Sequence, residues 1–268
     1  MRNFITTFAV LIAFLTQAPL TPLAFSQDDE QSWLFERKIL GVNSLVSIAD
    51  ISGTYEYDYA SAVARIERLD GSPFCTAARV GKNLFLTNFH CDYDCDSMQF
   101  SMGVEQGKTV GEKVTYLCKE LVHKAEEFDY ALFRVELAPN APQIEYSILT
   151  LSAAPVYQDQ SVFVASHPSG RLKEVDISAE CVISDIVPVL TDSGRNTIKH
   201  MCDTEGGSSG SPVIDRQTGH AVGLHWGGKT DLYNMAIPMA LILKNLKAEL
   251  PRSTFSQLRV VGLRRSGN

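Results

Sequence analysis

Three short segments of this sequence hold the residue types that nucleophilic catalysis requires. Ser209 lies in Gly-Ser-Ser-Gly-Ser-Pro at residues 207–212, His90 directly precedes Cys91, and Asp129 opens an apolar run. A serine hydroxyl is a weak nucleophile near neutral pH, so it needs a base within hydrogen-bond reach and a third group that fixes the tautomer of that base. The sequence therefore predicts Ser209 as the nucleophile, His90 as its base and Asp129 as the acid that orients His90.

These residues follow the chain order histidine, aspartate, serine, which is the order of chymotrypsin-like enzymes and not of subtilisins or α/β-hydrolases. Over residues 39–250 the chain resembles secreted chymotrypsin-fold serine peptidases, and among these the bacterial glutamyl endopeptidases. The resemblance rests on Leu-Thr-Asn-Phe-His at 86–90, on Asp-Thr at 203–204 with Gly-Ser-Ser-Gly-Ser-Pro-Val at 207–213, and on His-Trp-Gly-Gly at 225–228. It implies an all-β fold of two six-stranded antiparallel β-barrels of chymotrypsin type, with the site in the cleft between them.

The resemblance also implies the activity, namely a serine endopeptidase that cleaves protein or peptide substrates through an acyl-enzyme and needs no cofactor. The glycines around Ser209 suit a tight turn that aims the backbone N–H groups of Gly207 and Ser209 at one point. The negative oxygen of the tetrahedral intermediate would sit at that point. We therefore expect these two N–H groups to form the oxyanion hole.

The same resemblance places Thr204, His225, Trp226 and Gly227 in the substrate-binding region. An imidazole and a hydroxyl that converge there can bind a carboxylate by charge-assisted hydrogen bonds. The sequence thus predicts a preference for Glu before the scissile bond. A well-packed core strand at residues 225–226 is the competing interpretation.

Two other functions fit part of the pattern. Residues 206–210 also satisfy the Gly-x-Ser-x-Gly elbow of an α/β-hydrolase esterase with Ser208 as nucleophile, but that elbow requires a helix after it and residues 212–215 read as a strand. A catalytically silent binding protein with the same fold is the alternative from another class. Ser208 also stands where much of the family has an aspartate that pairs with a newly formed N-terminus, so activation by that ion pair is not expected.

Six cysteines in an exported chain indicate three disulfides, although the sequence alone leaves the connectivity open. The resemblance pairs Cys75 with Cys91, which would tie down the segment that carries His90. Cys181 and Cys202 flank the strand pair that leads to the loop of Ser209, and we expect them to pair. Cys95 and Cys118 both border the region between His90 and Asp129, and we expect them to form the third bridge. A zinc site competes weakly because the sequence has no Cys-x-x-Cys pair, and we expect no metal.

The acidic loop that follows His90 resembles the start of a calcium site. Asp92, Asp94 and Asp96 alternate there, but an EF-hand loop would need glycine at the sixth position and Glu at the twelfth, where Ser97 and Gly103 stand. A solvated acidic loop is the simpler interpretation. Four further histidines are expected to fill surface or strand positions: His123, His167, His200 and His220.

Composition and termini restrict the class of protein. The chain has 268 residues, 45% of them hydrophobic, and a formal net charge of -7, which argues against nucleic acid as a partner. Residues 1–26 read as a signal peptide and 27–38 as a propeptide ending in Glu-Arg-Lys or as a retained extension. We expect a secreted or periplasmic monomer with no membrane contact.

The rest of the chain consists of short β-type runs between turn residues, which is typical of an antiparallel barrel or sandwich. Expected strands include 62–66, 74–80, 84–86, 114–122, 130–137, 161–166, 175–186, 197–202, 212–214, 221–226 and 232–237. The junction of the two halves is expected near residues 139–155, where Pro-Asn-Ala-Pro breaks the pattern. Residues 238–250 predict a C-terminal helix, and the basic tail 251–268 either adds a strand at 258–263 or stays unstructured.

Overall fold

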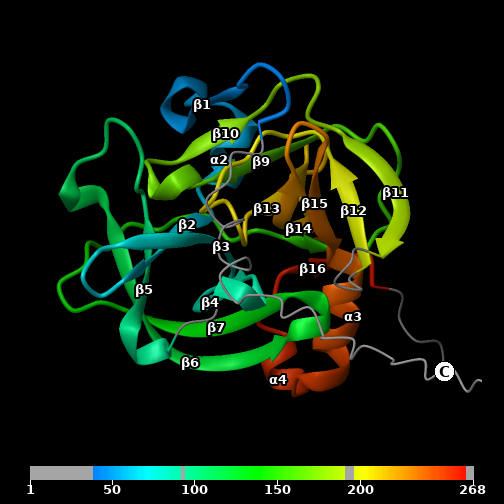
Figure 1. The fold of residues 1–268 in the computed structure, drawn as a ribbon. Helices are drawn as coiled ribbons and strands as arrows, with labels where there is room; N and C mark the ends of the chain where they lie inside the picture. The colour runs from blue at the N-terminus through cyan, green and yellow to red at the C-terminus, as the bar shows by residue number, and fades with distance from the viewer. Residues whose placement is uncertain (1–38, 92–93, 191–195, 264–268) are drawn as a thin grey trace, which may run out of the picture.

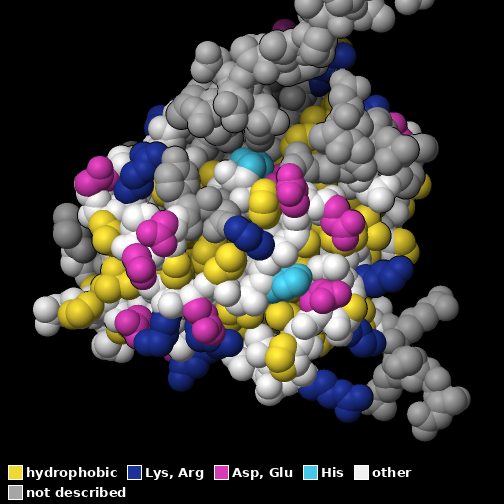
Figure 2. Space-filling model, turned by 60° about the horizontal axis from the view of Figure 1, so that its bottom comes forward, with side chains coloured by type: hydrophobic (Ala, Val, Ile, Leu, Met, Phe, Trp, Pro, Cys, Tyr) yellow, Lys and Arg dark blue, Asp and Glu magenta, His cyan; other side chains and the backbone are white. Residues whose placement is uncertain are grey.

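The computed structural model describes residues 39–91, 94–190 and 196–263. The expected signal peptide, residues 27–38 and the last five residues of the tail lie outside the described residues. No helix in the described part of the chain is long and apolar enough to cross a membrane. On the face shown in Figure 2, acidic and basic side chains are interspersed with one another and with small apolar areas.

The N-terminal half of the chain forms a closed antiparallel barrel, seen at the lower left of Figure 1, with a second sheet above it and to its right. Its strand order is β2-β3-β4-β7-β6-β5. Three aromatic rings meet in its core, with the centroid of Phe85 5.0 Å from that of Phe100 and the centroid of Phe133 5.8 Å from Phe100. The strands are β2 (Val63–Arg68), β3 (Pro73–Gly81), β4 (Leu84–Thr87), β5 (Met98–Met102), β6 (Val114–Ala125) and β7 (Tyr130–Leu137).

The C-terminal half, together with the early strand β1, forms a ten-stranded sheet with the path β1-β10-β9-β13-β14-β15-β12-β11, to which β8 and β16 add. The sheet curls back on itself, because an isolated bridge joins Ser161, beside β9, to Val182, beside β11. The strands are β1 (Leu45–Ser47), β8 (Leu151–Ser152), β9 (Val162–Ser166), β10 (Glu174–Asp176), β11 (Ile183–Leu190), β12 (Asn196–His200), β13 (Pro212–Asp215), β14 (Ala221–Lys229), β15 (Tyr233–Pro238) and β16 (Val260–Val261).

Two packed β-units with a C-terminal helix confirm the expected all-β fold of chymotrypsin type. The second unit is larger than a plain six-stranded barrel, since β1 and β10 extend its edge. The helices and helical turns are short: η2 (Ile48–Ile51), α2 (Tyr55–Ala60), η3 (Phe89–Cys91), η4 (Cys95–Ser97), η5 (Val110–Glu112), η6 (Glu126–Phe128), η7 (Pro168–Gly170), α3 (Met239–Glu249) and α4 (Arg252–Phe255).

Two strand predictions need correction. The expected strand 175–186 is interrupted because the chain turns after β10: Asp176 Oδ1 accepts from the N–H of Ser178, and Cys181 donates to the carbonyl of Ser178. An aspartate that bonds the backbone two residues on favours a turn over a continued strand. Strand β5 was not predicted from the sequence, although it closes the barrel between β2 and β6.

The C-terminal helix α3 begins one residue after Pro238, which takes the cap position. Its buried residues, Met239, Ile242, Leu243 and Leu246, follow the spacing of one helical face. Leu241 is only partly buried. In the tail, β16 pairs in parallel with β8, so the interpretation of an added strand holds for Val260–Val261.

Candidate active site

The first pair of predicted residues meets at the end of the closed barrel. His90 lies in η3 after β4, and Asp129 lies between η6 and β7 in the left-handed conformation, with φ 42°. The Nδ1 atom of His90 lies 2.9 Å from Asp129 Oδ2, and the backbone N–H of His90 donates to Oδ1 at 3.1 Å. The side chain of Asp129 is 0% exposed and that of His90 13%. A buried carboxylate bonded to both the ring and the backbone of one histidine fixes that histidine's orientation.

The segment that carries His90 is attached to the barrel on both sides. The disulfide Cys75–Cys91 joins it to β3, and the side-chain amide of Asn88 donates to the carbonyl of Asp129 at 2.9 Å. The structure also contains Cys95–Cys118 and Cys181–Cys202, so all three bridges are the pairs expected from the sequence. Cys75–Cys91 therefore limits how far His90 can move from Asp129.

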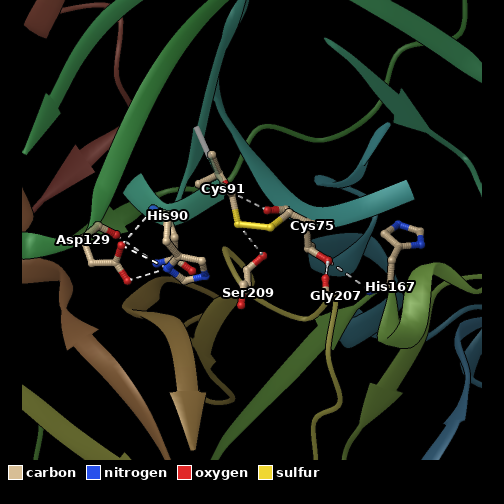
Figure 3. The surroundings of a disulfide bond; sticks show 10 residues. Cys75, His90, Cys91, Asp129, His167, Gly207 and Ser209 are labelled. Carbon is tan, nitrogen blue, oxygen red and sulfur yellow. Dashed lines mark hydrogen bonds and ion pairs between the residues drawn. A yellow bond between two sulfur atoms is a disulfide. The ribbon is translucent and has the colours of Figure 1, made fainter. Parts of the chain in front are cut away.

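Ser209 comes from the second sheet, on the loop before β13, and approaches His90 from the other side (Figure 3). Its carbonyl accepts from the N–H of Thr76 on β3 at 2.9 Å, so this loop is bonded directly to the first barrel. Gly210, with φ 86°, permits the approach: a Cβ there would lie 2.1 Å from the carbonyl oxygen of Thr76. The structure thus brings His90, Asp129 and Ser209 together where the two β-units meet.

The two residues expected to bind an oxyanion lie in this loop. Gly207 adopts φ 88°, and a Cβ on it would lie 2.8 Å from the carbonyl oxygen of His167. Ser208 between them points elsewhere: it is buried, and its hydroxyl donates to Ser166 Oγ at 3.0 Å. Ser208 is therefore poorly placed to act as a nucleophile, and the antiparallel sheets around it contradict the α/β-hydrolase interpretation.

The residues expected to bind substrate lie on β14 and, in the case of Thr204, shortly after the end of β12. The Thr204 hydroxyl donates to Asn234 Oδ1 at 3.0 Å, and Asn234 Nδ2 donates to the carbonyl of Cys202 at 2.7 Å. Asn234 lies opposite His200 in the pairing of β12 with β15, and Ala236 lies opposite His225 in the pairing of β14 with β15. The indole of Trp226 is turned aside and donates to Thr197 Oγ1, while Gly227, next in β14, has open space where a Cβ would lie.

His200, expected from the sequence only to fill a surface or strand position, lies in β12 beside His225. Both His200 and His225 are buried, and His200 Nε2 lies 3.1 Å from His225 Nδ1. Burial lowers the pKa of His225 well below its usual value, and the nearby His200 and His90 lower it further. Burial likewise lowers the pKa of His200 to about 3. Both rings are therefore neutral near pH 7, and His90 lies close enough to His225 to contribute to lowering its pKa.

Asp203 lies beside Thr204 but does not offer its charge to a ligand. Its two carboxylate oxygens accept from the backbone N–H groups of Leu40 and Ser44, each at 2.7 Å, and the residue is buried. Both oxygens of this carboxylate therefore already have hydrogen-bond donors within the protein. The N-terminal segment of the described chain is thereby attached beside Thr204.

The other acidic and histidine residues considered from the sequence, where the structure describes them, are bonded or buried within the fold. Asp94 caps η4, with Oδ1 accepting from the N–H of Asp96 at 3.4 Å, and Asp92 lies outside the described residues. His123 Nε2 lies 3.3 Å from Asn245 Oδ1 on α3, and His220 is partly buried. His167 is fully buried, contrary to a surface position, and its Nδ1 lies 3.1 Å from the carbonyl of Arg171.

The buried histidines predict how stability depends on pH. Burial lowers the pKa of His167, His200 and His225 in the folded chain, whereas each takes up a proton near pH 6.5 when unfolded. The unfolded chain therefore binds more protons as the pH falls below about 6.5, and the free energy of unfolding should decrease by up to about 1.4 kcal/mol per pH unit for each histidine. Urea unfolding at pH 7, 6 and 5 tests this. His200→Gln should reduce the slope, and a flat profile between pH 7 and 5 would contradict the assignment.

Residues 71–224 match the family described as trypsin-like peptidase domain. Among solved structures, the chain is similar to a Glu endopeptidase in complex with MPD, with a TM-score of 0.57 and 17% identity over 79% of this chain and 100% of that one. It is also similar to Deg5, with a TM-score of 0.52 and 18% identity over 70% of this chain and 88% of that one. These two likenesses concern the fold.

One curated relative is similar in sequence, the secreted RxLR effector protein 73 of Plasmopara viticola. The identity is 25% over 211 residues, which make up 72% of this chain and 52% of the relative. The chain thus spans about half the length of that relative.

Proposed function

We propose that Ser209, His90 and Asp129 are the catalytic residues of a serine endopeptidase, because this chain belongs to the trypsin-like peptidase family. The observation that carries the proposal is the buried carboxylate of Asp129, 2.9 Å from Nδ1 of His90. That contact leaves Nε2 of His90 as the ring nitrogen that can take a proton from Ser209.

The hydrolysis follows from this arrangement. Ser209 Oγ attacks the scissile carbonyl while His90 accepts its proton, and the N–H groups of Gly207 and Ser209 bind the oxygen that becomes negative. His90 then gives the proton to the leaving amine, which departs and leaves an acyl group on Ser209. A water molecule, deprotonated by His90, releases that group and restores the hydroxyl.

We further propose that the enzyme cleaves after Glu. For His225 to bind the carboxylate of Glu, Nε2–H of His200 must donate to Nδ1 of His225. Nε2 of His225 then carries the proton that the substrate carboxylate accepts. Thr204 supplies a second donor. Its hydroxyl donates to Asn234 in this structure, and the substrate carboxylate would compete with Asn234 for that hydrogen bond. Asp203, already bonded to two backbone N–H groups, gives little attraction for Lys or Arg. The name Glu endopeptidase of one similar structure agrees with this proposal.

His225→Ala tests the preference. A carboxylate that loses its partner in a buried site costs about 2–5 kcal/mol, so kcat/KM for a peptide with Glu before the scissile bond should fall by roughly 30- to 5000-fold. The value for the matched peptide with Gln should fall much less, because an uncharged amide depends less on that partner. A profile of wild-type cleavage sites on a peptide library supplies the baseline, with Glu first, Asp weaker and basic residues poor. Equal rates after Glu, Lys and Phe would refute the preference and leave the catalytic residues untouched.

Three disulfides are typical of a protein that works outside the reducing cytoplasm. We propose that residues 1–26 direct the chain out of the cell or into the periplasm and are then removed. The net charge of -7 and the mixed surface charge support protein or peptide partners over nucleic acid.

A further inference from the structure

The loop that would bind the oxyanion is held by the turn at residues 167–171, between β9 and β10. Within this turn, the N–H of Ser169 donates to the carbonyl of Gly206 at 2.5 Å, and Ser169 Oγ donates to Glu205 Oε2 at 3.0 Å. Arg171 Nη1 donates to the same Glu205 oxygen at 2.7 Å. Ser169 reaches these partners from the left-handed region, with φ 49°. The turn therefore binds both the backbone and a side chain of the two residues that precede Gly207.

Thr76 joins the same turn to Gly207 from the first barrel. Its hydroxyl donates to the carbonyl of Gly207 at 2.8 Å and accepts from the N–H of His167 at 3.1 Å. Figure 3 shows His167 beside Gly207, with the disulfide and Ser209 beyond them. Because the carbonyls of Gly206 and Gly207 both accept hydrogen bonds, the peptide between these residues is fixed in direction, and with it the N–H of Gly207.

Glu205 and Arg171 form the charged part of this contact. The Glu205 side chain is 6% exposed and that of Arg171 42%. A nearly buried carboxylate is costly unless it is paired and hydrogen-bonded, so Glu205 depends on Arg171 and Ser169. Glu174 on β10 holds the same guanidinium through Nε at 3.1 Å and Nη2 at 2.9 Å, which leaves Nη1 for Glu205.

We infer that Arg171 and Glu205 are positioning residues that keep the N–H of Gly207 aimed at the oxyanion. The inference rests on the proposed function, because it assigns a role toward the intermediate formed at Ser209. Ser208, which lies between Gly207 and Ser209, carries no charge, and its hydroxyl donates to Ser166 Oγ. The charged pair bonded to this loop is therefore formed by Glu205 of the loop and Arg171 of the turn.

The test compares Arg171→Met and the nearly isosteric Glu205→Gln with Arg134→Met. Arg134 pairs with Glu120 in the first barrel through a contact of 2.7 Å, equal in length to that between Arg171 and Glu205, but far from the loop in sequence and in sheet order. Three quantities are measured: kcat, KM, and the affinity for a peptide boronate that forms a tetrahedral adduct with the nucleophile. Near-ultraviolet circular dichroism checks that each variant is folded.

Losing one oxyanion donor outright costs about 10²- to 10³-fold in kcat, so a donor that is only misdirected should cost roughly 10- to 100-fold. We expect this loss of kcat in Arg171→Met and Glu205→Gln, with KM changed less than about threefold and boronate affinity reduced in parallel with kcat. Glu174→Gln should have a smaller effect because Arg171 keeps Glu205. Arg134→Met should match the wild type.

Wild-type kcat in folded Glu205→Gln would overturn the inference, as would a loss carried by KM alone or a loss of equal size in Arg134→Met. Failure of the proposed function has a different signature. In that case the wild-type protein itself would neither turn over the peptide nor bind the boronate at Ser209.

Discussion

Ser209→Ala is expected to lower kcat for a peptide substrate by about 10⁴-fold or more, because it removes the hydroxyl that we propose attacks with His90 as its base. KM should change little, because the substitution leaves His225 and Thr204, which we propose contact the substrate, with their bonds to His200 and Asn234. The measurement is steady-state turnover of the best peptide from the cleavage profile, with protein shown free of contaminating peptidase.

Ser208→Ala is the matched control for this substitution. It removes an adjacent hydroxyl that is buried and bonded to Ser166, so some stability should be lost while turnover persists. If Ser208→Ala abolished turnover and Ser209→Ala did not, the assignment of the nucleophile would be wrong.

Asp129→Asn is expected to lower kcat by about 10⁴-fold with the fold retained. The amide occupies the same space, but an N–H directed at Nδ1 of His90 favours the tautomer with its proton on Nε2, which cannot accept a proton from Ser209. Turnover and thermal unfolding of the variant are measured together, so that lost activity is separated from lost structure.

Asp94→Asn serves as the control for Asp129→Asn. Asp94 is an exposed acid in the loop after His90 whose bond to the N–H of Asp96 is local. This variant should keep wild-type turnover. An Asp129→Asn enzyme that remained within tenfold of the wild type would show that Asp129 does not set the tautomer of His90.

The residues around the nucleophile could be predicted from the sequence because their backbone requirements are local. Gly207 and Gly210 stand where a Cβ would collide with a neighbouring carbonyl, and His90 stands next to a bridged cysteine. Such requirements allow only glycine or cysteine at set distances along the chain from the catalytic candidates, so they are visible in the sequence. The order of the three segments along the chain then indicated the fold.

Contacts that depend on strand register could not be predicted in the same way. His200 meets His225 only because β12 and β14 both pair with β15 in a particular register, which no local pattern specifies. Asn234 was missed for the same reason. Glu205 and Arg171 lie 34 residues apart, and their pairing depends on how the turn 167–171 packs against the loop before Ser209.

The central claim is that Ser209 is the activated nucleophile, and covalent labelling tests it most directly. The folded wild-type protein is treated with a fluorophosphonate, which requires a serine activated by its base, and the modified residue is identified by mass spectrometry of peptides. We predict one adduct, on Ser209, that persists in Ser208→Ala and is absent from Ser209→Ala. An adduct on Ser208 would contradict the account. A folded wild-type protein that the reagent does not label would also contradict it, because that result indicates a catalytically silent binding protein.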